Sequence, residues 1–125
     1  ERTHWDTLVY NADFSQNSEN QSIKYLTTTG YSNYLNSLKN HSGKIWQEIK
    51  STILEYRPAV VGISATSQNF SSSCMIANIV KQVDKDIVVI VGGPHVSSVG
   101  SKVLNCEDIR DRNFLFPHYR GYHAY

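Results

Sequence analysis

The middle of the chain alternates between helical and strand-like patterns of apolar residues. A helical pattern over residues 43–57 begins after Ser42, a residue type that favours N-caps, and ends before Pro58. A second helical pattern over residues 74–83 follows three serines that can cap it, Ser71–Ser73, and a short helix is expected over residues 96–105. The first two patterns consist of Ile45, Trp46, Ile49, Ile53, Tyr56, Met75, Ile76, Ile79, Val80 and Val83.

Two continuous apolar runs lie between these helices. Residues 60–64 read VVGIS and residues 87–91 read IVVIV, and such runs are typical of parallel strands covered on both faces. Residues 5–12 form another β-prone run, which ends in turn residues and predicts a first strand. The alternation of strands and helices predicts an α/β fold with a parallel sheet and right-handed crossovers.

The segments on either side follow no clear period. Residues 15–42 are rich in Ser, Asn, Gln and Thr, which predicts an irregular segment with short helical turns near residues 31–38. Residues 106–125 are first charged and then aromatic, a pattern that favours a linker or docking segment toward another domain. The predicted organisation is one domain over residues 1–105 and a tail over residues 106–125.

Composition and charge narrow the class of protein. The 125 residues suffice for one domain, and the formal net charge of +1 gives no electrostatic sign of nucleic-acid binding. No apolar run is long enough for a membrane span and the first residues lack the core of a secretion signal, so we expect a cytoplasmic protein without a membrane partner. Cys74 and Cys106 form no CxxC motif and are expected to be free thiols.

Two loops after the predicted strands are suited to bind a ligand, because ligands of open parallel sheets lie at the carboxyl ends of the strands. The first loop offers small and polar side chains, and the second has paired glycines that allow close approach to the backbone. Helix capping and a tight turn are the alternative explanations of the same residues. The candidate binding residues are Ser64, Ala65, Thr66, Ser67, Gln68, Gly92, Gly93, Pro94 and His95.

Taken as a pair, VVGIS at residues 60–64 and VGGPH at residues 91–95 resemble the second half of a cobalamin-binding, Rossmann-like domain. In that family a Ser-x-Leu or Ser-x-Thr loop is followed, after a helix and a strand, by a Gly-Gly turn. Ser64-Ala65-Thr66 and Gly92-Gly93 are arranged in the same way. The residues of these two motifs are most similar to those in B12-dependent radical SAM enzymes of the anaerobic cyclase and methyltransferase branches.

The resemblance implies a flavodoxin-like, three-layer α/β domain with a mostly parallel sheet that holds cobalamin at its carboxyl end. The chain would be the cofactor-binding part of an enzyme, and a separate radical SAM domain with S-adenosylmethionine and a [4Fe-4S] cluster would perform methyl transfer or radical chemistry. By the same resemblance, the dimethylbenzimidazole nucleotide tail meets Ser64, Thr66 and Gln68, and its channel or the corrin edge is lined by Gly92, Gly93 and His95.

Three features depart from the family. No histidine stands in an Asp-x-His-x-x-Gly motif, so the axial ligand of cobalt is not expected to be a protein histidine. The leading strand and its helix, which would precede Trp5, have no counterpart, and we therefore expect a piece of a longer protein. The Cys-x-x-x-Cys-x-x-Cys motif is absent and two cysteines cannot hold a [4Fe-4S] cluster, so neither catalytic residues nor metal ligands are predicted in this chain.

A second class of protein stays open, namely a regulatory or protein-interaction module of flavodoxin-like fold that binds no ligand. Receiver modules need an acidic cluster and a lysine at strand ends, and flavin pockets need a phosphate-binding loop after the first strand; neither is evident. Hydrolase chemistry is not expected, because Thr66 replaces the last glycine of a G-x-S-x-G motif at residues 62–66. Visible absorbance of bound cobalamin would separate the two classes.

Overall fold

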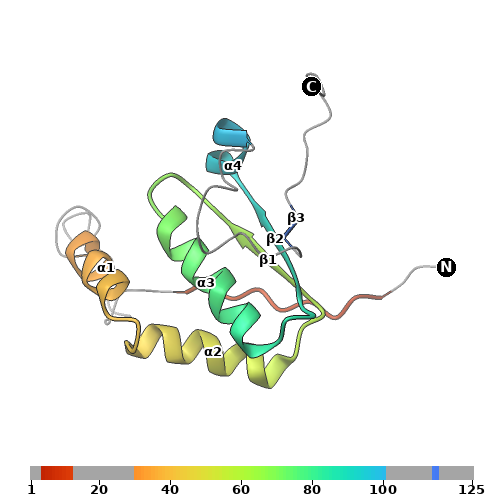
Figure 1. Ribbon diagram of the computed structural model, residues 1–125. Coiled ribbons are helices and arrows are strands. Elements are labelled where there is room, and N and C mark those ends of the chain that lie inside the picture. The colour runs from red at the N-terminus through yellow and green to blue at the C-terminus, as the bar shows by residue number, and fades with distance from the viewer. Residues whose placement is uncertain (1–3, 13–29, 101–113, 116–125) are drawn as a thin grey trace. The chain divides into compact units, whose positions relative to one another are not determined.

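The structure is a computed structural model that describes residues 4–12, 30–100 and 114–115 (Figure 1). The chain divides into two compact units, residues 1–45 and residues 46–125. The second unit contains the whole sheet and most of the helical structure. No helix in the described part of the chain is long and apolar enough to cross a membrane.

Three parallel strands form the sheet of the second unit. Strand β1 (Val60–Ser64) pairs with β2 (Val88–Gly92), and β2 pairs with the short β3 (Phe114–Leu115), so the strand order is β1-β2-β3. The register places Ser64 opposite Gly92 at the carboxyl ends of β1 and β2. The predicted Rossmann-like α/β class with a parallel sheet is therefore confirmed, and β3 lies within the segment that the sequence assigned to a tail.

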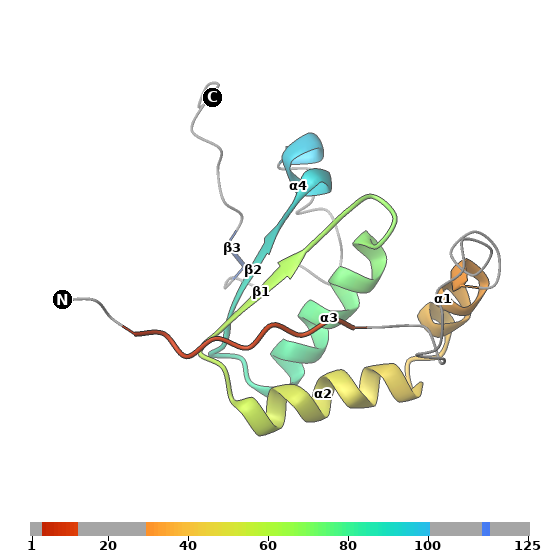
Figure 2. The ribbon, with the colours of Figure 1, turned by 180° about the vertical axis from the view of Figure 1, so that it is seen from behind.

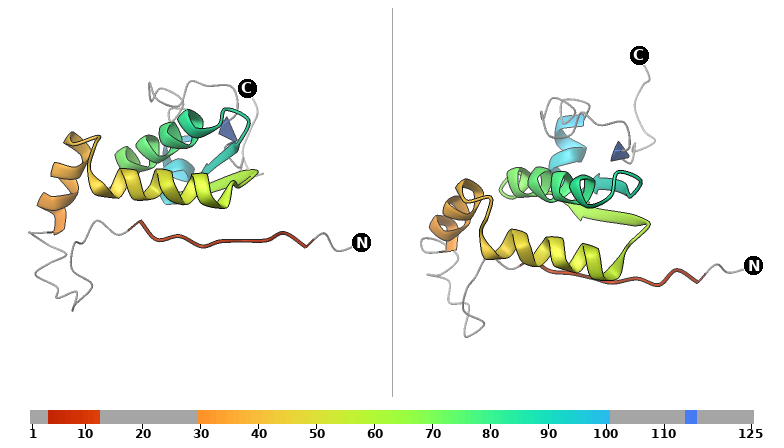
Figure 3. Two further views of the ribbon diagram at one scale, coloured as in Figure 1. Left: turned by 90° about the horizontal axis from the view of Figure 1, so that it is seen from below. Right: turned by 60° about the horizontal axis from the view of Figure 1, so that its bottom comes forward.

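Helices α2 (Lys44–Tyr56), α3 (Phe70–Val83) and α4 (Pro94–Val99) accompany the sheet. Helix α3 joins β1 to β2 and packs against both strands, whereas α4 packs against β2. The side chains of Ala77, Val80, Val89 and Val91 are fully buried, and they form the centre of the core. Helix α2 runs alongside α3 (Figures 1 and 3) and buries Trp46, Ile49 and Ile53.

The ends of these helices follow from local sequence. Helix α2 stops at Tyr56, because Pro58 disfavours helical backbone at the residue before it. That residue, Arg57, leaves the helix in a left-handed conformation with a φ of 48°. Helix α4 begins at Pro94, two residues earlier than predicted, because proline is well suited to the first helical position. The predicted continuation of this helix through residues 101–105 lies outside the described residues.

The three serines near the start of α3 do not cap it as predicted. The helix begins at Phe70, so the serines lie inside its first turns, and Asn69 is the N-cap residue. The hydroxyls of Ser72 and Ser73 donate to the carbonyl oxygen of Asn69 at 2.8 and 3.0 Å. A hydroxyl that bonds backward in this way is satisfied without covering the free N–H groups of the helix.

A buried lysine fixes the connection from α3 to β2. Lys81 is only 8% exposed, and its Nζ atom donates to the carbonyl oxygens of Lys85 at 3.0 Å and Ile87 at 2.5 Å. Both acceptors lie in the turn that follows the helix. The ammonium group therefore holds the chain in the turn that sets the start of β2.

Replacement of this lysine tests the role of that turn. We expect Lys81→Met to lower the free energy of unfolding by about 1–3 kcal/mol, because the substitution keeps the apolar stem and leaves carbonyl oxygens without their charged donor. Chemical denaturation measures the change. Lys50→Met, at an exposed position of α2, is the control and is expected to change stability by less than about 0.5 kcal/mol. Equal effects of the two substitutions would contradict the assigned role.

Strand β1 is covered on one face by the described residues, and the prediction of burial on both faces is wrong for this part of the chain. Ile63 is buried on the side of α3, whereas Val60, Gly62 and Ser64 are exposed on the other side. Side chains alternate between the two faces of a strand, so these three residues share one surface. A Cβ atom added to Gly62 would meet no atom within 4 Å.

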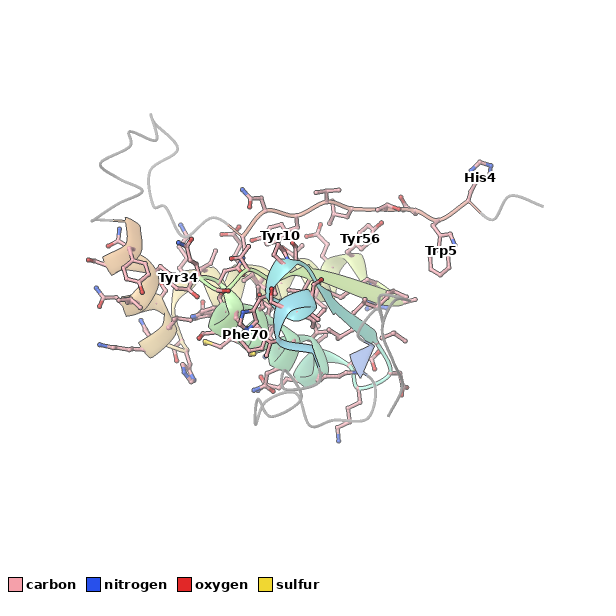
Figure 4. The ribbon with its side chains drawn as sticks, turned by 90° about the horizontal axis from the view of Figure 1, so that it is seen from above. His4, Trp5, Tyr10, Tyr34, Tyr56 and Phe70 are labelled. Carbon is pink, nitrogen blue, oxygen red and sulfur yellow. The ribbon has the colours of Figure 1, made fainter. Side chains whose placement is uncertain are left out.

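The first unit contains helix α1 (Gly30–Lys39) and the extended segment 4–12, drawn in orange and red in Figure 2. The prediction of short helical turns near residues 31–38 underestimated α1, in which the rings of Tyr31 and Tyr34 stack at 6.2 Å between centroids. The predicted strand over residues 5–12 is extended but pairs with no described strand. Trp5, labelled in Figure 4, is 72% exposed.

Candidate functional site

The structure brings all nine candidate residues to one edge of the sheet. Ser64 and Gly92 are partners in the β1–β2 register, so the two loops leave the sheet side by side. Side-chain exposure then separates the nine residues into three groups. Ala65 is fully buried, Gly92, Gly93 and His95 are partly buried, and the exposed positions are Ser64, Thr66, Ser67, Gln68 and Pro94.

Backbone hydrogen bonds tie the two loops together beyond the end of β1. The N–H group of Ala65 donates to the carbonyl oxygen of Gly92 at 2.7 Å, and the N–H group of His95 donates to the carbonyl oxygen of Ala65 at 3.2 Å. Ala65 thus uses both of its backbone polar groups to contact the second loop. The two loops form one braced surface, which we call the loop pair, residues 64–69 and 92–95.

The second glycine of the Gly-Gly turn is explained by the packing of the loop pair. Gly93 has φ 112° and ψ −179°, a region of backbone conformation that is nearly restricted to glycine. A Cβ atom at this position would lie 2.6 Å from the carbonyl oxygen of Ala65 and 3.0 Å from its nitrogen. The backbone of Ala65 therefore fills the space that the missing side chain leaves.

The first loop closes on itself through a reciprocal pair of hydrogen bonds. The N–H group of Thr66 donates to Oδ1 of Asn69 at 2.6 Å, and the N–H group of Asn69 donates to Oγ1 of Thr66 at 3.4 Å. The arrangement resembles a capping box, in which residues three apart exchange such bonds before a helix. The nine candidate residues leave out Asn69, although the Thr-x-x-Asn spacing ahead of an apolar helix was a signal for its role.

The ring of His95 is held from two directions. Its Nδ1 atom lies 3.0 Å from Oγ of Ser67, and its ring centroid lies 4.3 Å from that of Phe70, with the planes inclined by 35°. Figure 4 shows Phe70 at the start of α3, next to α4. No sequence pattern pointed to Phe70, because its contact with His95 joins two elements that only the fold brings together.

Several side chains of the loop pair at the carboxyl edge are exposed. A shallow hollow does occur at the other end of the sheet, where α3 ends, and it is lined by Asn78, Lys81, Gln82, Val83, Asp84 and Lys85. These residues belong to the end of α3 and the turn that follows it, and none of them belongs to the loop pair. Cys74 is buried and forms no disulfide, as predicted, and Cys106 lies outside the described residues. No group of three or more potential metal-ligating side chains occurs within the described ranges.

Comparison with known proteins identifies the family. The family described as B12 binding domain matches residues 24–112, which include the loop pair and α3. A protein of Pyrococcus horikoshii named "Uncharacterized methyltransferase PH0819" is 33% identical over 52 residues, which are 42% of this chain and 11% of that protein. The chain thus matches only a small part of the length of that relative. No solved structure matches.

The family match and the geometry agree on where the distinctive residues lie. The matched range covers well over half of the chain, and within it the parallel strands β1 and β2 end in the two loops that the sequence singled out. The predicted resemblance to cobalamin-binding domains is therefore confirmed, while its radical SAM subgroup stays a prediction. This chain belongs to the B12 binding domain family.

Proposed function

We propose that the chain holds cobalamin against the loop pair, as the cofactor-binding module of a larger methyl-transferring enzyme. The observation that carries the proposal is the brace between the loops, which lies inside the range matched by the B12 binding domain family. Loops that are already fixed to one another lose little conformational entropy when they bind a ligand. We assign the nine candidate residues to this contact.

The chemistry of the loop pair fits cobalamin. The rim of the corrin carries amide groups, and its nucleotide tail carries a phosphate and ribose oxygens, so the molecule is recognised by groups that donate and accept hydrogen bonds. Ser64, Thr66, Ser67 and Gln68 expose such groups at one edge of the sheet. Ala65 and Gly93, which pack on one another, shape the surface. Bound cobalamin would supply a cobalt centre that can carry a methyl group.

The proposed catalytic partner is a separate radical SAM domain with S-adenosylmethionine and a [4Fe-4S] cluster. The printed name of the Pyrococcus relative contains the word methyltransferase, and most of that protein lies outside the matched stretch, which supports a further domain. Methyl transfer is the reaction we propose, ahead of a cyclase reaction. Because Leu115 is part of β3, we assign the proposed connector to the residues that follow it. We place the enzyme in the cytoplasm.

A specific observation favours one alternative, a regulatory or interaction module without a ligand. Several polar groups of the loop pair are satisfied within the protein: Thr66 bonds Asn69, and Ser67 bonds His95. Loops of this kind are stable without a ligand. Such a module would have the same brace and would bind no corrin.

Hydroxocobalamin binding distinguishes the two proposals. We expect the folded chain to retain corrin absorbance in its visible spectrum after incubation with hydroxocobalamin and desalting. Ser64→Trp should abolish retention, because Ser64 is an exposed residue at the carboxyl end of β1. The matched control is Val60→Trp, an exposed position on the same face at the amino end of β1, which should retain the cofactor.

Two results would contradict the cobalamin proposal. One is a chain that is folded by circular dichroism and retains no corrin, which would favour the ligand-free module. The other is equal loss of retention in the Ser64 and Val60 variants, which would show that the cofactor does not lie at the carboxyl edge. Circular dichroism of both variants separates lost binding from lost folding.

A further inference from the structure

The imidazole of His95 is fixed by contacts that leave one of its nitrogens available. The Nδ1 atom faces Oγ of Ser67, and the ring face packs against Phe70. Among the described residues, Nε2 has no hydrogen-bond partner. The ring is partly buried, at the same edge of the sheet as the exposed polar residues of the first loop.

The contact with Ser67 couples its hydroxyl to the tautomer of the ring, because either Ser67 or Nδ1 can donate the hydrogen. The Ser67 hydroxyl has no second hydrogen bond among the described residues, and it can rotate to donate its hydrogen to Nδ1. If Ser67 donates, Nδ1 is the acceptor and Nε2 carries the hydrogen of the neutral imidazole. A nitrogen that carries a hydrogen is a donor and has no lone pair for cobalt.

We propose that His95 is a hydrogen-bond donor to an oxygen of cobalamin through Nε2–H, and that Ser67 and Phe70 are the residues that position it. This inference rests on the proposed cobalamin function. The acceptor is either the phosphate of the nucleotide tail or an amide carbonyl of the corrin rim, both of which are oxygen acceptors. Ser67 sets the tautomer, and Phe70 restricts rotation of the ring.

The tautomer can be measured without cobalamin. Long-range ¹H–¹⁵N spectra of the chain labelled at histidine report which ring nitrogen carries hydrogen. The chain has five histidines, so a His95→Gln variant assigns the signals. We expect a protonated Nε2 for His95 in the wild-type chain and tautomer averaging in Ser67→Ala.

Ser98→Ala is the matched control for that experiment. Ser98 lies in the same short helix as His95, and its hydroxyl donates to the carbonyl oxygen of Pro94 at 2.9 Å, away from the imidazole. Its removal should leave the His95 signals unchanged. A wild-type ring protonated at Nδ1, or Ser67→Ala spectra identical to those of the wild type, would overturn the proposed role of Ser67.

Affinity for cobalamin tests the donor role. Gln presents an amide N–H at about the reach of Nε2, whereas Asn is shorter, so His95→Gln should bind within about threefold of the wild type and His95→Asn about tenfold more weakly. Phe70→Leu should also weaken binding and broaden the His95 signals. Equal affinity of all these variants would overturn the inference.

Cobinamide, which lacks the nucleotide tail, identifies the acceptor. If the phosphate accepts the hydrogen bond, His95→Asn should bind cobinamide as well as the wild type does. If a rim carbonyl accepts it, the tenfold loss should persist. A chain that shows the Nε2–H tautomer and binds no corrin would overturn both the donor role and the proposed function, while the contact with Ser67 would stand.

Discussion

Gly93→Ala is expected to lower the free energy of unfolding by about 2–4 kcal/mol, because the conformation is strained for a residue with a Cβ and the added atom overpacks a backbone. The φ of Gly93 is 112°, and its new Cβ would lie 2.6 Å from the carbonyl oxygen of Ala65. The backbone of Ala65 cannot easily move away from the new Cβ, because both its N–H group and its carbonyl oxygen are hydrogen-bonded to the second loop. Chemical denaturation measures the loss.

Gly62→Ala is the matched control for the glycine experiment. Gly62 lies in β1 with no atom within 4 Å of a built Cβ and without a positive φ. The substitution should change stability by less than about 1 kcal/mol, with a gain as the expected sign, because glycine weakens strand interiors. Equal destabilisation by the two substitutions would show that Gly93 is not special, or that the exposed face of β1 is covered in the whole protein.

Trp46→Ala is expected to destabilise the domain by about 3–5 kcal/mol, which is the range for deletion of a fully buried aromatic side chain. Trp46 is 2% exposed at the start of α2, and it shares a buried stripe with Ile49 and Ile53. Loss of the indole leaves a cavity beside α2. Urea denaturation followed by circular dichroism is the measurement.

The other tryptophan of the chain provides the control. Trp5 is 72% exposed in the extended segment 4–12, so Trp5→Ala should change stability by less than about 0.5 kcal/mol. Fluorescence of the two variants should reflect the same difference in burial. Trp5→Ala, which retains Trp46, should show the emission of a buried indole. A large loss of stability on removal of Trp5 would show that this segment is packed in solution.

The fold was predictable where apolar periodicity was strong and unbroken. The patterns that predict α2, β1, α3 and β2 locate all four elements within a few residues, because each element buries a continuous stripe or run. Prediction failed where polar residues dominate. Helix α1 has a weak apolar stripe, with Tyr31 and Leu35 exposed, and the β-prone residues 5–12 pair with none of the described strands.

The candidate site was predictable in position and less so in its internal contacts. The rule for ligand sites in parallel sheets placed the nine residues at one edge, and the structure brings them together there. The rule could not show that Ala65 is buried, or that Gly93 is required by the first loop. The rule could not predict the contacts of His95 with Ser67 and Phe70 either, because contacts between loops depend on the register of β1 and β2.

The brace between the loops constrains how this domain can change its ligand. A larger side chain at residue 93 displaces Ala65, and a shift of Ala65 alters the hydrogen bond to the N–H group of His95. A substitution at residue 93 is therefore expected to be tolerated only together with a change in the first loop. Transfer of a new ligand preference from a relative would succeed when residues 64–69 and 92–95 are exchanged together, and exchange of either loop alone should give a misfolded edge.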